Sequence, residues 1–163
     1  MSWFLMICMG LALLPQAGIA RTLAPGVTTV HDAIGKALTM DSFFRTLQRP
    51  RSPNHWLVAP EGFAVKPDAA APVFAVPATA LRDAFKVVLR QTPGAAIATE
   101  ADDGLHVVYT SAVFGFKDDI HVRVFPLSPQ QSTLALYLAS RVGYWDFGTN
   151  RRRVEDLISR IRA

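Results

Sequence analysis

The alternation of apolar and polar residues between positions 95 and 140 constrains the fold more than any other feature of the chain. Two turn signals interrupt it, at residues 102–104 (Asp-Asp-Gly) and 128–131 (Ser-Pro-Gln-Gln). Apolar side chains at every second position are typical of strands with one buried face. Strands that are joined by turns this short run antiparallel. The pattern therefore predicts two hairpins, Ala95–Val113 and Ile120–Ser140, in one antiparallel sheet.

Two segments outside the hairpins have the apolar spacing of helices. One follows Pro77, which suits a first helical turn, and its stripe comprises Leu81, Ala84, Phe85, Val88 and Leu89. The other can be capped by Thr149 or Asn150, and its stripe comprises Val154, Leu157, Ile158 and Ile161. Two such helices can cover one face of a sheet. We therefore expect a single α+β domain, with an antiparallel sheet of four or five strands and two helices packed on one face.

The first twenty residues have the pattern of a signal peptide. An unbroken apolar run, Trp3–Leu14, is too short to span a bilayer and is followed by Pro15. Small residues at Gly18 and Ala20 then form a cleavage-site pattern, so we predict cleavage after Ala20 and export to the periplasm. Because the run is not preceded by Lys or Arg, an uncleaved membrane anchor with the domain facing the periplasm is the alternative.

Residues 21–48 are predicted to form a linker and a short N-terminal helix. Thr28 or Thr29 can cap this helix, and apolar residues follow at helical spacing. We expect the helix to pack on the domain, with an amphipathic element on a membrane surface as the alternative. Residues 49–72 are rich in Pro and should form a loop that lies extended across the surface, before a short strand at Val73–Val76.

The composition narrows the class of protein and its partners. Half of the 163 residues are hydrophobic and 18% are charged, which fits a globular domain with a packed core. The formal net charge of +4 allows an anionic partner, but no nucleic-acid motif occurs, so nucleic acid is not expected as a partner. The single cysteine, Cys8, lies in the N-terminal run, and no cofactor-binding motif is present. We therefore predict no disulfide and no cofactor.

Three segments carry unusual motifs: residues 51–54 (Arg-Ser-Pro-Asn), 111–119 (Ser-Ala-Val-Phe-Gly-Phe-Lys-Asp-Asp) and 140–155 (Ser-Arg-Val-Gly-Tyr-Trp-Asp-Phe-Gly-Thr-Asn-Arg-Arg-Arg-Val-Glu). Together they resemble the bacterial domain of unknown function 1499 family, over about residues 49–163. The resemblance implies the bounds of the domain, and the family name assigns no activity.

The chain departs from that family's pattern at two places. His55 stands where many members have a Cys, and Tyr137-Leu138 stand where many have Arg-Ser. A role that rests on that Cys, Arg or Ser therefore does not carry over to this chain.

Asp118 and Asp119 are candidates for acid–base or metal chemistry. Adjacent residues at the start of a strand point to opposite faces, so the two carboxylates need not converge. In the alternative interpretation, one carboxylate caps a turn and the other pairs with an arginine. The histidines show no zinc-ligand spacing, and the simplest hairpin register places His106 and His121 away from facing positions. We therefore predict no metal site.

Three arginines, residues 151–153, open the last helix, where each cation opposes the helix dipole by roughly 0.3–1 kcal/mol. A sequence that breaks a local rule often does so at a site, and guanidinium groups with free backbone N–H groups could hold an anion. Internal pairing with Asp118, Asp119 or Asp146 is the alternative.

The helical spacing separates the roles of these arginines. At about 100° per residue, Arg151 falls near the edge of the apolar stripe. We therefore predict that Arg151 reaches inward to a partly buried carboxylate, of Asp146 or of the Asp118–Asp119 turn, and that Arg152 is solvated. Arg152 and Arg153 are then the possible anion-binding residues. The complete candidate site comprises Asp118, Asp119, Arg141, Asp146, Asn150 and Arg151.

These observations favour an exported envelope protein with a non-enzymatic binding or accessory domain. Its partner would be a membrane or envelope protein, or a small anion at the Arg-rich helix start. The alternative is a small hydrolase-like enzyme that uses Asp118 or Asp119 with Arg141, which requires these side chains to converge in a cleft. The residue pattern does not identify the ligand or the oligomeric state.

Overall fold

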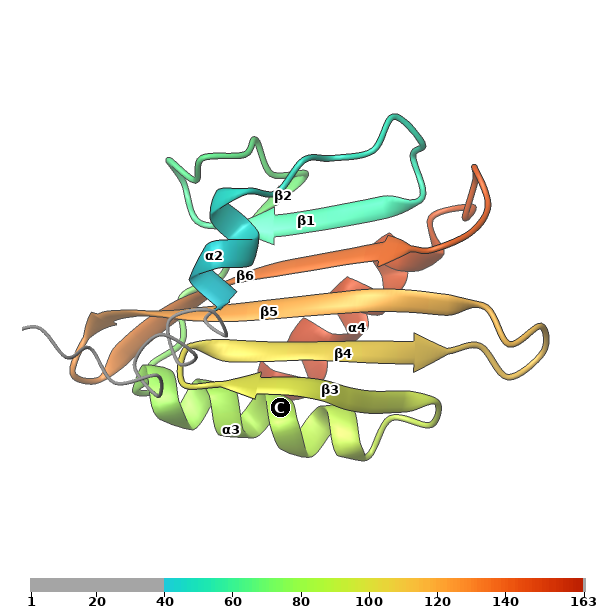
Figure 1. Ribbon diagram of the computed structural model, residues 1–163. Coiled ribbons are helices and arrows are strands. Elements are labelled where there is room, and N and C mark those ends of the chain that lie inside the picture. Colours follow the sequence, from blue (N-terminus) through green and yellow to red (C-terminus); the bar gives the residue numbers. More distant parts are fainter. Residues whose placement is uncertain (1–39, 163) are drawn as a thin grey trace, which may run out of the picture.

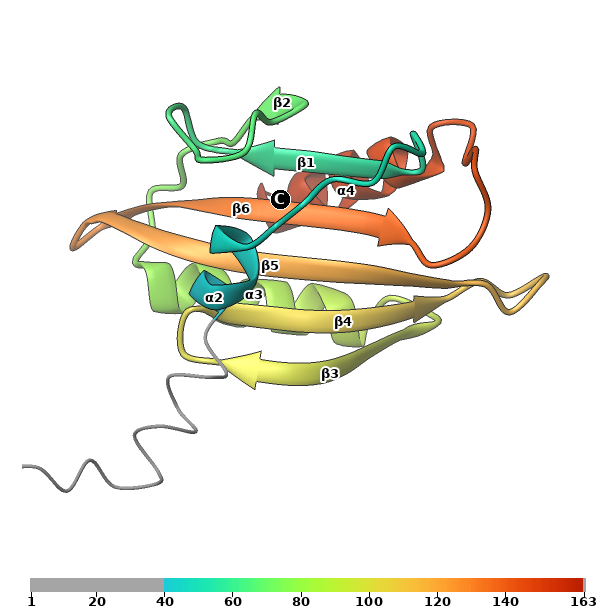
Figure 2. The same cartoon turned by 45° about the horizontal axis from the view of Figure 1, so that its top comes forward.

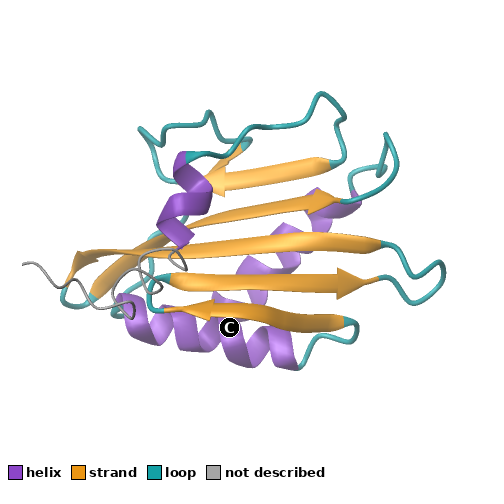
Figure 3. Ribbon diagram, viewed as in Figure 1, coloured by secondary structure: helices purple, strands orange, loops and turns teal. Residues whose placement is uncertain are grey.

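The computed structural model describes residues 40–162, which form one six-stranded sheet with helices on both faces (Figures 1 and 3). The predicted signal peptide and the helix expected at Thr28 or Thr29 lie outside the described residues. In chain order the elements are α2 (Met40–Arg45), β1 (His55–Ala59), β2 (Ala69–Ala70), α3 (Ala78–Arg90), β3 (Ala95–Ala101), β4 (Gly104–Thr110), β5 (Lys117–Ser128), β6 (Gln131–Ser140) and α4 (Thr149–Arg162). The strand order is β2-β1-β6-β5-β4-β3.

The strands β3 to β6 form the predicted antiparallel meander. The register places Leu105 opposite Val122 and Val122 opposite Leu136, so apolar side chains of three strands line one face. The turn between β3 and β4 requires a glycine, because a Cβ at Gly104 would collide with the carbonyl oxygen of Val122. Both predicted hairpins are confirmed.

The expected number of strands is too low, because part of residues 49–72 is a strand and not a surface loop. β1 pairs antiparallel with β6, from His55 opposite Ala139 to Val58 opposite Leu136, and β2 pairs parallel with β1. The edge of the meander offers free hydrogen-bonding groups, and an extended segment between prolines can use them. The short strand expected at Val73–Val76 is reduced to a single bridge, between Phe74 and Ser132.

The helices α3 and α4 pack on one face of the sheet, as predicted, while α2 packs on the opposite face (Figure 2). The larger core joins Phe85 of α3 and Leu157 of α4 to the apolar side chains of β4, β5 and β6. The smaller core joins Met40 and Phe44 of α2 to Leu57. We expected a helix within residues 21–48 to pack on the domain, but we did not predict that a third helix covers the opposite face of the sheet. Within the described residues, no helix is both long and apolar enough to cross a membrane.

Candidate functional site

The β4–β5 and β6–α4 loops lie at the same end of the sheet (Figures 1 and 2). Both loops line a pocket of about 480 Å³. The β4–β5 loop contributes Phe114 and Phe116, and the β6–α4 loop contributes Val142, Trp145 and Phe147. The segment before β1 adds a third wall through Asn54. The pocket therefore unites the three segments that carry the unusual sequence motifs.

An ion pair lies among the polar residues that line this pocket. The Nη1 atom of Arg153 donates to Oδ2 of Asp118 at 2.5 Å, and the two side chains are only 17% and 9% exposed. The guanidinium group also lies over the ring of Tyr109, 3.8 Å from its centroid. A charge-assisted bond and a cation–π contact therefore hold the first turn of α4 against β4 and β5.

The structure corrects the prediction for Arg151. Its Nε atom donates to Glu155 at 2.8 Å, its side chain is 58% exposed, and it lies over the ring of Trp56. An apolar stripe on a helix has two edges, and the placement of α4 turns the Arg153 edge toward Asp118 and the Arg151 edge toward β1. Arg152 is exposed, as predicted, and donates to the carbonyl oxygen of Phe147 at 2.9 Å.

The carboxylate of Asp146 caps α4. Its oxygens accept hydrogen bonds from the backbone N–H groups of Gly148 and Asn150, at 3.0 and 2.9 Å. A negative charge at this end of a helix interacts favourably with the helix dipole and offsets the arginines that follow. The N–H groups that we expected to bind an external anion are thus occupied in part by the chain's own Asp146.

Asn150 is 1% exposed and joins the three walls of the pocket. Its Nδ2 atom donates to the carbonyl oxygen of Asn54 at 2.6 Å and to Oγ of Ser140 at 3.1 Å. The Nδ2 atom of Asn54 in turn donates to the carbonyl oxygen of Gly143 at 2.6 Å. We did not predict that Asn54 links these segments, although it belongs to the unusual Arg-Ser-Pro-Asn motif.

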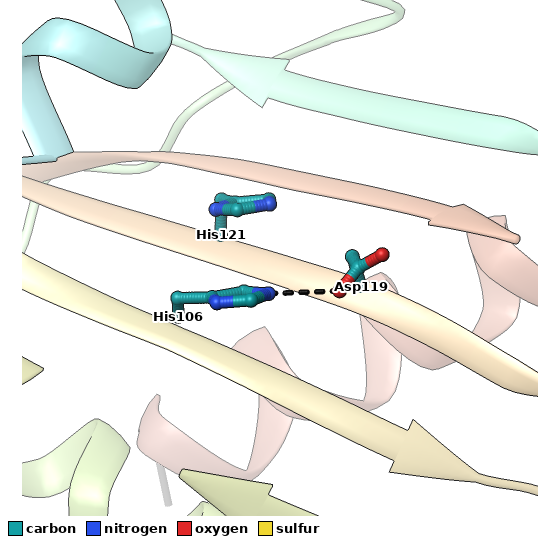
Figure 4. A group of neighbouring side chains, drawn as sticks. All are labelled: His106, Asp119 and His121. Atoms are coloured by element: carbon teal, nitrogen blue, oxygen red, sulfur yellow. Dashed lines mark hydrogen bonds and ion pairs between the residues drawn. The ribbon is translucent and has the colours of Figure 1, made fainter. Parts of the chain in front are cut away.

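Asp118 and Asp119 point to opposite faces of the sheet, as their positions in a strand suggested. Asp118 lines the pocket, whereas Asp119 accepts hydrogen bonds from His106 Nε2 and from both Nε and Nη2 of Arg141, each at 2.8 Å. Figure 4 shows Asp119 with the two histidines of this face. Asp119 and Arg141 therefore meet, but away from the pocket that holds Asp118.

His106 and His121 lie directly opposite each other, which contradicts the register that we expected for them. β4 ends at Thr110 and β5 begins at Lys117, each three residues earlier than predicted, so the turn is shifted along the chain and the two histidines come into register. Their rings stack at 4.3 Å, and Phe43 of α2 stacks on His121 at 3.6 Å.

The protonation of this second cluster follows from its contacts. The hydrogen bonds from Arg141, with a smaller effect of His106, lower the pKa of Asp119 to about 2. Burial, with a smaller effect of the neighbouring His106, lowers the pKa of His121 to about 4. At neutral pH, Asp119 is therefore ionised and His121 is neutral.

The same cluster brings together three residue types that can bind metals, which the sequence spacing did not indicate. One ligand atom each from His106, Asp119 and His121 lies within 4.8 Å of the others. An imidazole nitrogen binds a metal in the plane of its ring, however, and these two rings are parallel to within 3°. Arg141 also occupies both oxygens of the carboxylate. The arrangement favours an oriented His–Asp–Arg cluster over a metal centre.

Comparison with known proteins identifies one family. The profile of a family described as protein of unknown function (DUF1499) matches residues 46–161. The match includes every residue described above for the pocket and confirms the resemblance of the three motifs. A comparison with curated proteins finds no match.

Replacing Arg153 should destabilise the fold far more than replacing Arg151. Arg153→Ala leaves the buried Asp118 carboxylate without its partner, so we expect the free energy of unfolding to fall by about 3 kcal/mol. Arg151→Ala removes only an exposed pair, at a cost below about 1 kcal/mol. Urea denaturation of both variants measures the difference, and Asp118→Asn should recover part of the loss in the Arg153→Ala background. Equal effects of the two single substitutions would contradict the assignment of the internal pair.

Acid should destabilise the protein through His121. In the unfolded chain the pKa of His121 is the ordinary 6.5, whereas in the folded protein it is about 4. The contribution of neutral His121 to the free energy of unfolding is therefore fully present above pH 6.5 and is lost as the pH falls toward 4. The loss is about 2 kcal/mol at pH 5. The pKa of His55 is also lowered by burial, so His121→Phe is the informative variant. Its stability at pH 7 and pH 5, measured by denaturation, should differ less than that of the parent protein.

Proposed function

We propose a binding function for this chain, which belongs to the family of proteins of unknown function DUF1499: its pocket takes up the apolar part of a small molecule. The observation that carries the proposal is a pocket of ligand size whose walls are mainly aromatic and aliphatic side chains. Binding pockets for small molecules commonly have volumes of roughly 300–1,000 Å³, apolar walls and a few polar groups.

The polar residues of the pocket favour binding over catalysis. Asp118 and Arg153 neutralise each other, so a ligand need not carry a charge. The planar guanidinium group has further N–H donors beyond the one given to Asp118, and these can orient an acceptor group of the ligand. Of the groups that could form an anion site at the start of α4, only the exposed Arg152 lacks a carboxylate partner within the described residues. Asp118 binds Arg153, and Asp146 accepts hydrogen bonds from the backbone of the helix start.

The enzyme alternative has weaker support from the geometry. It needs Asp118 or Asp119 to act with Arg141 in a cleft, but Asp119 and Arg141 lie on the face opposite to the pocket. Asp119 is held as a hydrogen-bond acceptor by three N–H groups, which lowers its basicity. We therefore favour a binding or accessory domain.

We also propose that the protein is exported to the periplasm. The support is the apolar run at residues 3–14, the small residues before Arg21, and a domain free of cysteine, which suits an oxidising compartment. A membrane-anchored form that faces the periplasm is the alternative for the same segment.

A large side chain placed in the pocket should weaken the binding of apolar probes. Ala112 lines the pocket, so Ala112→Trp should weaken the binding of the neutral fluorophore N-phenyl-1-naphthylamine by about tenfold or more. The exposed Ala96 of β3 offers a matched control, because Ala96→Trp adds the same side chain elsewhere. Fluorescence titration measures both variants, and undiminished binding by Ala112→Trp would refute the proposed pocket. Tighter binding of the anionic relative 1-anilinonaphthalene-8-sulfonate would show that the arginines contribute.

Export predicts a defined mature chain. Intact-mass measurement of protein from the periplasmic fraction should give the mass of a chain that begins at Arg21. A full-length chain that stays with the membrane would support the anchor in place of a cleaved signal peptide.

A further inference from the structure

The exposed aromatic side chains of this domain are concentrated in two loops. Seven large hydrophobic residues in the β4–β5 and β6–α4 loops are 52–80% exposed: Val113, Phe114, Phe116, Val142, Tyr144, Trp145 and Phe147. Among all exposed large hydrophobic residues within 40–162, every Phe, Tyr and Trp belongs to one of these two loops. A patch of this kind on a domain marks an interaction surface.

The two loops form one continuous surface, which we call the aromatic rim and define as residues 113–116 and 142–147. Both loops lie at the same end of the sheet (Figures 1 and 2), and both line the pocket. The rings of Phe114 and Phe116 stack at 5.5 Å. The rim therefore surrounds the pocket, and its aromatic side chains face outward.

The backbone of the rim holds these side chains outward at a cost. Phe147 has a φ of 53°, in the left-handed region, and its residue is 80% exposed. This conformation is unfavourable for a non-glycine residue, so neighbouring structure must offset its cost. Here the following turn is held by Asp146 and by the hydrogen bond from Arg152 to the Phe147 carbonyl oxygen.

Positive charge borders the aromatic rim. Lys117 follows the first loop and Arg152 follows the second, and both are exposed. Within residues 40–162, neither side chain lies within ion-pair distance of a carboxylate. Trp and Tyr side chains prefer the interface between lipid and water, and cations beside an inserted apolar group bind anionic head groups. A flat anionic surface with an apolar interior matches both properties.

We propose that the aromatic rim docks on the surface of an anionic phospholipid bilayer. Phe114, Trp145 and Phe147 enter the interfacial layer, while Lys117 and Arg152 contact lipid phosphates. The pocket mouth then faces the lipid. This inference goes beyond the proposed binding function and does not depend on the identity of the pocket's ligand.

The test uses Trp145 as a local probe in the full chain. The substitutions Trp3→Phe and Trp56→Phe leave Trp145 as the single tryptophan of the chain. Its emission then reports on the rim and not on the N-terminal apolar run, which can itself bind lipid. Vesicles of equal parts phosphatidylglycerol and phosphatidylcholine should shift Trp145 emission to shorter wavelength, and brominated lipid should quench it. Phosphatidylcholine vesicles alone should produce a clearly weaker response, because the attraction to the cations is lost.

Matched variants separate the rim from general hydrophobicity. The double substitution Phe114→Ser and Phe147→Ser should weaken the Trp145 response by at least about tenfold in lipid concentration. Leu127→Ser is the control, because Leu127 is 53% exposed but lies near the other end of β5. Lys117→Glu with Arg152→Glu should weaken binding to anionic vesicles only. Unchanged melting temperatures would show that the variants are folded.

The proposal is overturned if anionic vesicles leave Trp145 emission unchanged, or if the double serine variant responds as strongly as Leu127→Ser. An equal response to anionic and neutral vesicles would refute the part assigned to Lys117 and Arg152. Ala112→Trp blocks the pocket without removing the rim, so it should retain docking. Failure of rim docking can therefore be distinguished from failure of pocket binding.

Discussion

Two buried asparagine residues hold together the end of this domain that contains the pocket. Asn150 in α4 and Asn54 before β1 are 96 residues apart in the chain, and the amide of one donates to the backbone of the other. A buried donor that is left without an acceptor costs about 1–3 kcal/mol, so these hydrogen bonds allow little freedom in how the two segments meet. Through Ser140 and Gly143, the same network sets the path of the β6–α4 loop. The walls of the pocket depend on that path.

The alternation of side chains along β5 divides the chemistry of the domain between two faces. Asp118 supports the helix that closes the pocket, whereas Asp119 belongs to a cluster of histidine and arginine side chains under α2. Two adjacent carboxylates thus have separate partners and separate roles. The two carboxylates that line the pocket are both engaged within the protein, Asp118 by Arg153 and Asp146 by backbone N–H groups of α4, which gives the pocket little free charge.

The distribution of aromatic residues gives a second view of the same end of the molecule. The domain buries Phe44, Phe74 and Phe85 in its two cores and keeps the aromatic residues of two loops exposed. Exposed aromatic surface is unfavourable in water, and the left-handed backbone of Phe147 adds to this cost. An apolar pocket and an apolar rim at one end fit a ligand with an apolar part and a bilayer surface with an apolar interior.

Local pattern was enough to determine the meander, the two packed helices and the single α+β domain, because these depend on the spacing of apolar residues within each segment. It was also enough to show that Asp118 and Asp119 diverge, since neighbouring strand residues always do. Only the tertiary structure decided that residues 55–59 are a strand, because that segment needs the free edge of β6. Tertiary structure likewise decided that Arg153 and not Arg151 pairs with a buried carboxylate, and that His106 faces His121. Both depend on how elements are placed against one another, through the docking of α4 and the position of the β4–β5 turn along the chain. No local periodicity contains that information.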